Sequence, residues 1–318
     1  MAVCLVTGGA GFIGSHLVEA LVARGDHVRV LDDLSSGRLE NLAGVMSQIE
    51  FVRGDIKDSA GVQAAVTGVD YIFHLAGLVS VSRSMAEPLE AELQNAVGTL
   101  NLLVAAKEGG VRRVIFSSTC AVYGDEPTLP KTETSLIRPK SPYTVSKLAA
   151  EAYCRLFNEA FGVETVVLRY FNVFGPRQDP SSVYSGVISI FTDKLLQGTA
   201  PFIYGDGEQT RDFVYVGDVV QANLLAMQTP DATGQTFNIG TGHPISINQL
   251  FETARRLVGS HLEANYQPPR PGDIVHSFTD PALARSVLGW SAQVQFEDGL
   301  KQVVECAKNY PNGPLTNR

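Results

Sequence analysis

Residues 2–14 read AVCLVTGGAGFIG, and this stretch decides the fold. The apolar run 2–6 is typical of a strand that is buried on both faces. The glycine-rich turn 7–14 completes the stretch, and the residues after it place apolar side chains at helical spacing. A second strand, 28–31, ends at two aspartates. This order of strand, glycine turn, helix, strand and acid is the fingerprint of a dinucleotide-binding unit.

The glycines of this turn suit a backbone that a phosphate must approach closely. Gly8, Gly11 and Gly14 carry no Cβ to block a pyrophosphate. The helix that begins there offers it unpaired N–H groups and a positive dipole end. Asp32 can accept hydrogen bonds from both ribose hydroxyls of NAD and would repel a 2′-phosphate, although the nearby Arg38 keeps NADP open. A glycine turn that binds no nucleotide is the structural alternative.

The composition limits the classes of protein that the chain can form. Of its 318 residues, 44% are hydrophobic and 18% are charged, which suits a compact globular chain of about two domains. Its formal charge of -8 argues against nucleic acid or an acidic membrane surface as a partner. The glycine turn follows the N-terminus at once, and the charge-free stretch 232–251 contains Pro244, so we expect neither a leader peptide nor a membrane span.

The four cysteines are spread along the chain, at positions 4, 120, 154 and 306. They form no CxxC pair and no dense framework, so neither a metal site nor a disulfide scaffold is predicted. Isolated thiols are typical of a reducing compartment, and we therefore expect a cytoplasmic protein. His16 and His74 lie in no metal-ligand spacing, so we expect them to be packing or helix-surface residues.

Strand and helix patterns alternate as far as about residue 170. The patterns predict strands at 49–53, 71–75, 113–116 and 164–169, and helices at 60–66, 89–107 and 143–161. Such an alternation predicts an α/β fold with a doubly wound, Rossmann-type parallel sheet and ligands at the C-terminal strand ends. Glycines and prolines cluster beyond it. We therefore predict an NAD-binding domain over 1–170 and a smaller, interleaved α/β substrate-binding domain over 171–318, with a soft boundary.

A second motif brings a tyrosine and a lysine to the same end of the sheet. Tyr143 and Lys147 lie four residues apart on a predicted helix and share one face, and Thr119 follows a predicted strand. A nearby ammonium and the positive nicotinamide ring would lower the tyrosine pKa from about 10. Together the three residues suit removal of a proton from an alcohol whose hydride passes to NAD. A surface pair or a packed tyrosine is the alternative interpretation.

On these residues the chain resembles the extended short-chain dehydrogenase/reductase family, and within it the UDP-sugar 4-epimerases. The matching motifs are 7–14, 32–34, 54–56, 74–77, Asn95, 117–124, 143–147 and 169–176. The resemblance implies further residues of the NAD site, in addition to Gly8, Gly11, Gly14, Asp32, Tyr143 and Lys147. They are Phe12, Ile13, Asp33, Leu34, Ser36, Gly37, Asp55, Ile56, Leu75, Ala76, Gly77, Asn95, Tyr170 and Phe171.

The reaction that the resemblance implies is inversion at C4 of a UDP-hexose. Tyr143 would take the O4 proton and NAD the C4 hydride, and the 4-keto sugar would turn over before the hydride returns to its other face. The related 4,6-dehydratases carry an Asp-Glu pair directly after the position of Thr119. This chain has Cys120-Ala121 there, which disfavours dehydration.

The resemblance also implies which residues of the second domain hold the substrate. Arg211 and Arg270 would grip the diphosphate, Asp273 a uridine ribose hydroxyl, and Asn172 the phosphate or sugar region. Ser277 stands where a bulky tyrosine excludes N-acetyl sugars in related enzymes. With Ser277 and the segment 177–185, we expect UDP-GlcNAc and UDP-GalNAc to be accepted, and UDP-Glc and UDP-Gal in addition.

Two rival functions stay open at this point. A UDP-glucuronate 4-epimerase or decarboxylase would be favoured if Arg83 or Arg177 lay near C6 of the sugar. An NAD-sensing regulator would keep the fold without needing Thr119, Tyr143 and Lys147. The family also implies a homodimer, formed by the predicted helices 89–107 and 143–161, although their apolar residues could equally face their own sheet.

Overall fold

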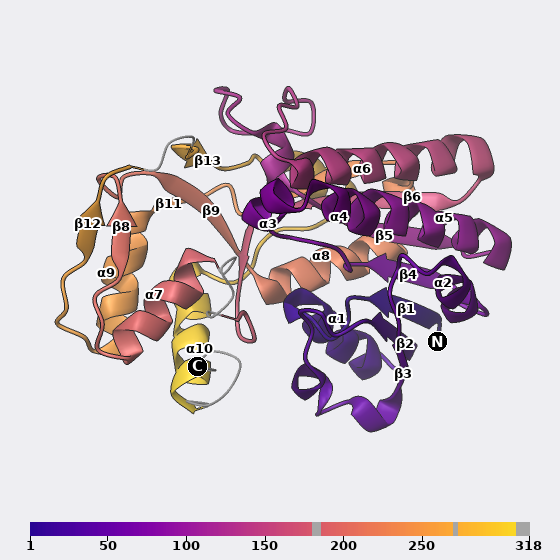
Figure 1. Ribbon diagram of the computed structural model, residues 1–318, viewed down its shortest axis with the longest axis horizontal. Helices are drawn as coiled ribbons and strands as arrows, with labels where there is room; N and C mark the ends of the chain where they lie inside the picture. The colour runs from indigo at the N-terminus through magenta and orange to yellow at the C-terminus, as the bar shows by residue number, and fades with distance from the viewer. Residues whose placement is uncertain (180–185, 270–272, 310–318) are drawn as a thin grey trace.

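A seven-stranded parallel sheet forms the centre of the computed structural model, which describes residues 1–179, 186–269 and 273–309 (Figure 1). The strands follow the order β10-β6-β5-β4-β1-β2-β3. They are β1 (Val3–Thr7), β2 (His27–Asp32), β3 (Ile49–Arg53), β4 (Tyr71–His74), β5 (Arg113–Thr119), β6 (Glu164–Tyr170) and β10 (Thr236–Ile239). The order reverses between β1 and β4, which is where a doubly wound sheet opens a ligand crevice. The predicted fold class is confirmed.

Alternate side chains of each strand face opposite layers of helices, because successive residues of a strand point to opposite faces. Val6, Val30 and Ile115 belong to the apolar cluster under α1 (Phe12–Ala23) and α8 (Val216–Gln228). Their neighbours Leu5, Leu31 and Val114 belong to the cluster on the other face. That face is covered by α2 (Ser59–Val66), α5 (Gly98–Gly109) and α6 (Pro142–Phe161). Burial on both faces explains why the strands read as continuous apolar runs.

The predicted helix 89–107 is present but is not one regular helix. It begins as α4 (Pro88–Glu92), passes through a π-helical turn (Leu93–Val97) and continues as α5. The short α3 (Val81–Ala86) precedes it, and α5 ends at Gly110, whose φ of 68° is left-handed. Proline at the first helical position is compatible with a helix start, because that N–H has no helical partner. The π turn carries Asn95 toward the loop after β4, where it matters for the site.

The chain beyond β6 builds a second, smaller α/β layer and also returns to the first (Figure 1). A four-stranded sheet contains β7 (Asn172–Phe174), β9 (Thr210–Tyr215), β11 (Pro244–Ser246) and β13 (His276–Ser277), and a two-stranded sheet contains β8 (Phe202–Tyr204) and β12 (Asn265–Gln267). Its helices are α7 (Val187–Leu196), α9 (Ile247–Val258) and α10 (Phe296–Asn309). Shorter 3-10 or π turns cover Leu39–Leu42, Met46–Gln48, Cys120–Tyr123, Pro230–Ala232 and Ala284–Leu288. Because α8 and β10 pack with the first unit, the chain crosses between the two, and the division at residue 170 stays a prediction.

Three further features bear on the excluded classes. No helix within the described ranges is both long and apolar enough to cross a bilayer. Over the same part of the chain, no group of three or more His, Cys, Asp or Glu side chains is arranged to hold a metal ion. All four cysteines are free thiols, which agrees with their predicted isolation, and the cytoplasmic location stays a prediction.

Candidate active site

A cavity of about 930 Å³ lies at the C-terminal ends of the central strands. Every residue predicted for the cofactor lines it, with the exception of Asn95. Thr119, Tyr143 and Lys147 line the same cavity, so the cofactor residues and the reactive residues meet in one place. This is the position that the reversal of strand order between β1 and β4 predicts for a ligand.

The glycine turn is packed so closely that side chains would not fit. Gly8 has a φ of 70°, and a Cβ on it would lie 2.7 Å from the backbone nitrogen of Ala76. A Cβ on Gly14 would lie 2.1 Å from the carbonyl oxygen of Gly8. Gly11 begins α1, and no side chain of the described residues caps that helix start. Its first N–H groups are therefore available to an anion, as a pyrophosphate requires.

Asp32 is held in one position at the end of β2. Its carboxylate accepts backbone N–H bonds from Ala10 and Leu34, each at 2.9 Å. Burial raises the pKa of this carboxyl above its usual value, and the two N–H bonds oppose that shift. Gly37 approaches so closely that a Cβ there would lie 2.8 Å from the carboxylate. A fixed acid beside a glycine turn fits the ribose of NAD.

Asn95 lies behind the cavity wall rather than on it. Its amide side chain exchanges two hydrogen bonds with the backbone of Leu78, at 2.8 and 3.0 Å, and donates a third to Ser146. It is 1% exposed. Asn95 therefore holds the loop after β4 that carries Gly77, and in the structure it shapes the cofactor site without lining it. Its predicted place in the NAD site stays a prediction.

His74 occupies the buried packing position that the sequence predicts. Its ring nitrogens lie 2.7 Å from the Thr7 hydroxyl and 2.9 Å from the Thr99 hydroxyl. Burial lowers the pKa of His74 to about 3, so the imidazole is neutral at pH 7. His16 contacts the carbonyl of Pro176 at 3.0 Å from α1. Both histidines connect parts of the chain, as packing residues do.

The reactive triad is positioned by the start of α6 and the end of β5. Ser141 and Thr144 cap the helix start reciprocally, which places Tyr143 in the first turn and Lys147 one turn later. The Lys147 ammonium donates to the carbonyl of Ser117 at 2.9 Å. Thr119, two residues further along β5, lies close enough to the Tyr143 hydroxyl to act on its pKa. Both side chains of the helix therefore face the strand end, as their spacing predicts.

Burial controls the ionisation of both groups on this helix face. It raises the pKa of Tyr143 to about 12, against a smaller lowering by the Thr119 hydrogen bond. It lowers the pKa of Lys147 to about 8. The expected lowering of the tyrosine pKa is therefore not present in the protein alone, because desolvation of the phenolate outweighs the neighbouring donors. A positive nicotinamide ring, when bound, would act in the opposite direction.

The predicted substrate residues gather on the second sheet, beside the catalytic strand end. Ser277 on β13 lies opposite Arg211 on β9, and both residues lie close enough to the Cys120 thiol to act on its pKa. The negative charge of Asp273 acts on Arg211, although burial has the larger effect and lowers the pKa of this guanidinium. Cys120 therefore joins the two units one residue after Thr119. In the sequence analysis, Cys120 mattered only because the related 4,6-dehydratases have an acidic residue at this position.

Two further residues were predicted for the substrate. Asn172 opens β7, which runs parallel to β9 with Asn172 opposite Phe213. Arg270 lies outside the described residues, as do Tyr184 and Ser185 of the sugar-selective segment. The structure therefore brings together Arg211, Asp273 and Ser277 from the predicted set.

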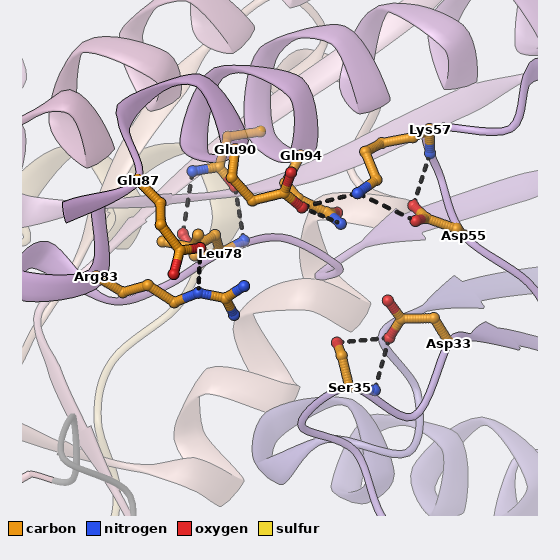
Figure 2. A network of polar contacts seen from close by, with 10 residues as sticks. Asp33, Ser35, Asp55, Lys57, Leu78, Arg83, Glu87, Glu90 and Gln94 are labelled. Atoms are coloured by element: carbon orange, nitrogen blue, oxygen red, sulfur yellow. Dashed lines mark hydrogen bonds and ion pairs between the residues drawn. The ribbon is translucent and has the colours of Figure 1, made fainter. Parts of the chain in front are cut away.

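Several cations that line the cavity form ion pairs, which the sequence did not reveal as pairs, and Figure 2 shows those of Lys57 and Arg83. Four cations that line the cavity each bond a carboxylate. The pairs are Lys57–Glu90 at 2.7 Å, Arg83–Glu87 at 3.0 Å, Arg38–Asp179 at 2.6 Å and Arg177–Glu19 at 2.6 Å. Lys57 follows the predicted residues Asp55 and Ile56 directly, which was a usable signal. No sequence signal pointed to Glu90 or Asp179, because both residues are remote in sequence from their partners.

The glycine turn lies where the strand order reverses, between β1 and β4, and beside it lies the buried pair of Tyr143 and Lys147. This combination of fold and site defines a nucleotide-dependent enzyme of the dehydrogenase type. Residues 4–240 match the NAD dependent epimerase/dehydratase family. The chain belongs to this family. The predicted family, its NAD cofactor and the epimerase class of enzyme are thereby confirmed.

Individual relatives are similar over nearly their whole length. The UDP-glucose 4-epimerase of Mycolicibacterium smegmatis is 43% identical over 314 residues, which cover 96% of this chain and 98% of the relative. The crystal structure of a Thermotoga maritima UDP-glucose 4-epimerase with UDP-glucose matches with a TM-score of 0.93 and 42% identity, over 98% of this chain and 100% of that one. A UDP-N-acetylglucosamine 4-epimerase from Methanobrevibacter ruminantium, in complex with UDP-N-acetylmuramic acid, matches with a TM-score of 0.93 and 40% identity, over 97% and 98%.

Proposed function

We propose that the protein inverts C4 of a UDP-hexose, with UDP-GlcNAc and UDP-GalNAc accepted and UDP-Glc and UDP-Gal in addition. The observation that carries this proposal is the meeting of Tyr143, Lys147 and Thr119 in the cofactor cavity, with Ser277 and Arg211 adjoining through Cys120. The similarity to epimerases of both sugar classes supports the same reaction.

The proposed mechanism uses each side chain for one task. NAD, when bound, supplies the acceptor and later the donor of the C4 hydride. Tyr143 takes the O4 proton as the carbonyl forms, and it returns that proton when the alcohol is restored. Thr119, which lies close to the tyrosine hydroxyl, holds the O4 group in line. Lys147 places a cation near the tyrosine and favours its phenolate. Proton and hydride are both returned, so the reaction is a net isomerisation.

Cys120 supports epimerisation over dehydration. Burial raises the pKa of this thiol to about 12, so it stays protonated and is a poor acid or base at neutral pH. Ala121 has no titratable group. Neither residue can protonate a C6 leaving group or withdraw the C5 proton, and the 4-keto sugar is left to be reduced again.

The glucuronate alternative requires a cation that is available to the C6 carboxylate. Arg83 is paired with Glu87, and Arg177 bonds both Glu19 and Ser15. Because each arginine already pairs with a neighbouring carboxylate, neither is available to bind the C6 carboxylate of a uronate. This arrangement favours a neutral hexose as the substrate. The deciding experiment incubates the purified protein separately with UDP-Glc, UDP-GlcNAc and UDP-GlcA and follows the anomeric protons by NMR. C4-inverted hexose supports the proposal, and turnover of UDP-GlcA alone replaces it with the alternative.

Substituting Ser277 with tyrosine is expected to lower UDP-GlcNAc turnover at least about tenfold while UDP-Glc turnover is largely kept. The added ring would fill the space beside Cys120 and Arg211, where we place the C2 substituent. Initial rates with both sugars measure the effect. His276→Tyr is the matched control, since His276 precedes Ser277 on β13 and bonds Thr210 instead. Equal UDP-GlcNAc turnover by Ser277→Tyr and the parent would overturn the assignment.

We propose a homodimer formed by the helices that the resemblance singled out. Large apolar side chains are exposed along α4, the π turn and α6, among them Leu89 at 78%, Leu93 at 44% and Leu156 at 47%. Contact between two copies would cover them. The parent is expected to have twice the mass of one 34.2 kDa chain by light scattering, and Leu93→Glu with Leu156→Glu the mass of one. Tyr266→Glu, an exposed aromatic on β12, is the control; a monomeric parent contradicts the proposal.

A further inference from the structure

Arg38 lies beside the carboxylate that selects the ribose of the cofactor. Its backbone N–H donates to the carbonyl of Ala10 in the glycine turn at 3.0 Å. The residue before it, Gly37, is in close contact with the Asp32 carboxylate. Arg38 itself lines the cofactor cavity. An arginine in this neighbourhood of a dinucleotide fold is the type of residue that accommodates the 2′-phosphate of NADP.

The guanidinium of Arg38 is engaged by a carboxylate from a distant part of the sequence. Its Nη2 donates to Oδ2 of Asp179 at 2.6 Å, across 141 positions of the sequence. Asp179 also lines the cavity. Both side chains are 28% exposed, so the pair lies at the edge of the cavity rather than in the core. A pair of this exposure contributes little to the stability of a fold, and its position relative to Asp32 calls for another explanation.

We propose that Asp179 is a determinant of cofactor choice, because it holds Arg38, an arginine beside the ribose site that could bind a 2′-phosphate. Asp32 and Asp33 already place negative charge there. A phosphate would add about two more negative charges, and the pairing with Asp179 keeps Arg38 from offsetting them. Lys57 and Arg83 are paired in the same way (Figure 2), as is Arg177. The glycine turn and the start of α1 would therefore bind the pyrophosphate.

The proposal assigns selectivity to a residue far from the motif that usually predicts it. Asp32 repels a 2′-phosphate directly, whereas Asp179 acts through Arg38. Asp179 is therefore a positioning residue for the guanidinium, and its effect should vanish when Arg38 is absent. This dependence separates the proposed role from a simple loss of negative charge near the cavity.

The test is a competition between the two cofactors on the full-length protein. The holoenzyme is incubated with a large equimolar excess of NAD⁺ and NADP⁺, desalted, denatured and analysed for bound nucleotide by chromatography. Asp179→Asn keeps the shape of the side chain and removes its charge. We expect this variant to raise the ratio of bound NADP⁺ to bound NAD⁺ about tenfold over the parent, which corresponds to about 1.4 kcal/mol.

Two further variants decide the interpretation. The double variant Arg38→Ala with Asp179→Asn is expected to return the ratio to that of the parent. Glu19→Gln is the matched control, because it releases Arg177, two residues before Asp179, from its own ion pair, and it should leave the ratio unchanged. The proposal is overturned if Asp179→Asn stays within twofold of the parent, or if the double variant keeps the full gain. Circular dichroism of all variants confirms that each is folded.

Discussion

Replacing Tyr143 with phenylalanine is expected to lower kcat by about a hundredfold to ten-thousandfold, the range for loss of a general base. The phenyl ring keeps the packing of the buried side chain but has no oxygen to accept the O4 proton. The glycine turn, Asp32 and the loop held by Asn95 are untouched by this substitution. Bound NAD, quantified by chromatography after denaturation, is therefore expected to match the parent while the rate of C4 inversion collapses.

Tyr153→Phe is the matched control for this substitution. Tyr153 lies on the same helix and is half-buried against the core beneath it, away from the cofactor cavity. Its loss of a hydroxyl should leave kcat unchanged. If Tyr143→Phe retains the parental rate within about threefold, the base lies elsewhere. The regulator hypothesis would instead be supported if both the parent and the variant bound NAD without inverting C4, since a sensor of NAD needs no proton acceptor at this position.

The sequence motifs group the residues predicted for the cofactor mainly because most of their determinants are local. Gly14 closely approaches the carbonyl of Gly8, six residues earlier, although the backbone that Gly8 itself approaches, at Ala76, lies after the neighbouring strand β4. The Tyr143–Lys147 spacing fixes a shared helix face whatever the rest of the chain does. Continuous apolar runs likewise predicted the strands, because the helical layers bury both faces of the sheet.

Features that depend on contacts between residues distant in the chain could not be predicted from the sequence. The Arg38–Asp179 and Lys57–Glu90 pairs form only when separate loops meet at the cavity mouth. Asn95 was assigned to the cofactor from its motif, but its distance from the cavity wall depends on how the π turn packs under Leu78. The tyrosine pKa was expected to fall, since charge partners are visible in sequence whereas the degree of burial is not.

Glu151 lies one turn beyond Lys147 on α6 and is buried behind the catalytic strand. Its carboxylate receives two bonds from the Arg169 guanidinium, at 2.9 and 2.6 Å, and a third from the Ser118 hydroxyl. The Glu151 and Arg169 side chains are 10% and 8% exposed. Arg169 also donates to Tyr123 at 3.0 Å. This network ties α6, β5 and β6 together directly under Thr119.

Glu151→Gln is expected to lower the free energy of unfolding by about 3–5 kcal/mol, because it leaves the Arg169 charge buried without its partner. Calorimetry should show a melting temperature lower by roughly 5 °C or more. The negative charge of Glu151 also supports the ammonium of Lys147, whose pKa should fall below about 8 in the variant. The loss of stability and the lower Lys147 pKa have the same cause. A buried cation without its counterion is not solvated as it would be in water, so its charged form is disfavoured.

Two comparisons separate the buried pair from ordinary surface charge. Glu297→Gln breaks the exposed Arg256–Glu297 pair, which has a similar distance of 2.8 Å, and it should leave the melting temperature unchanged. Glu151→Met combined with Arg169→Met removes both charges and fills the space, and it should recover more than half of the lost stability. If Glu151→Gln melts with the parent, the carboxylate contributes nothing that an amide cannot replace. If the double variant is less stable than Glu151→Gln, the pair itself, rather than the unpaired charge, stabilises the strand end that carries Thr119.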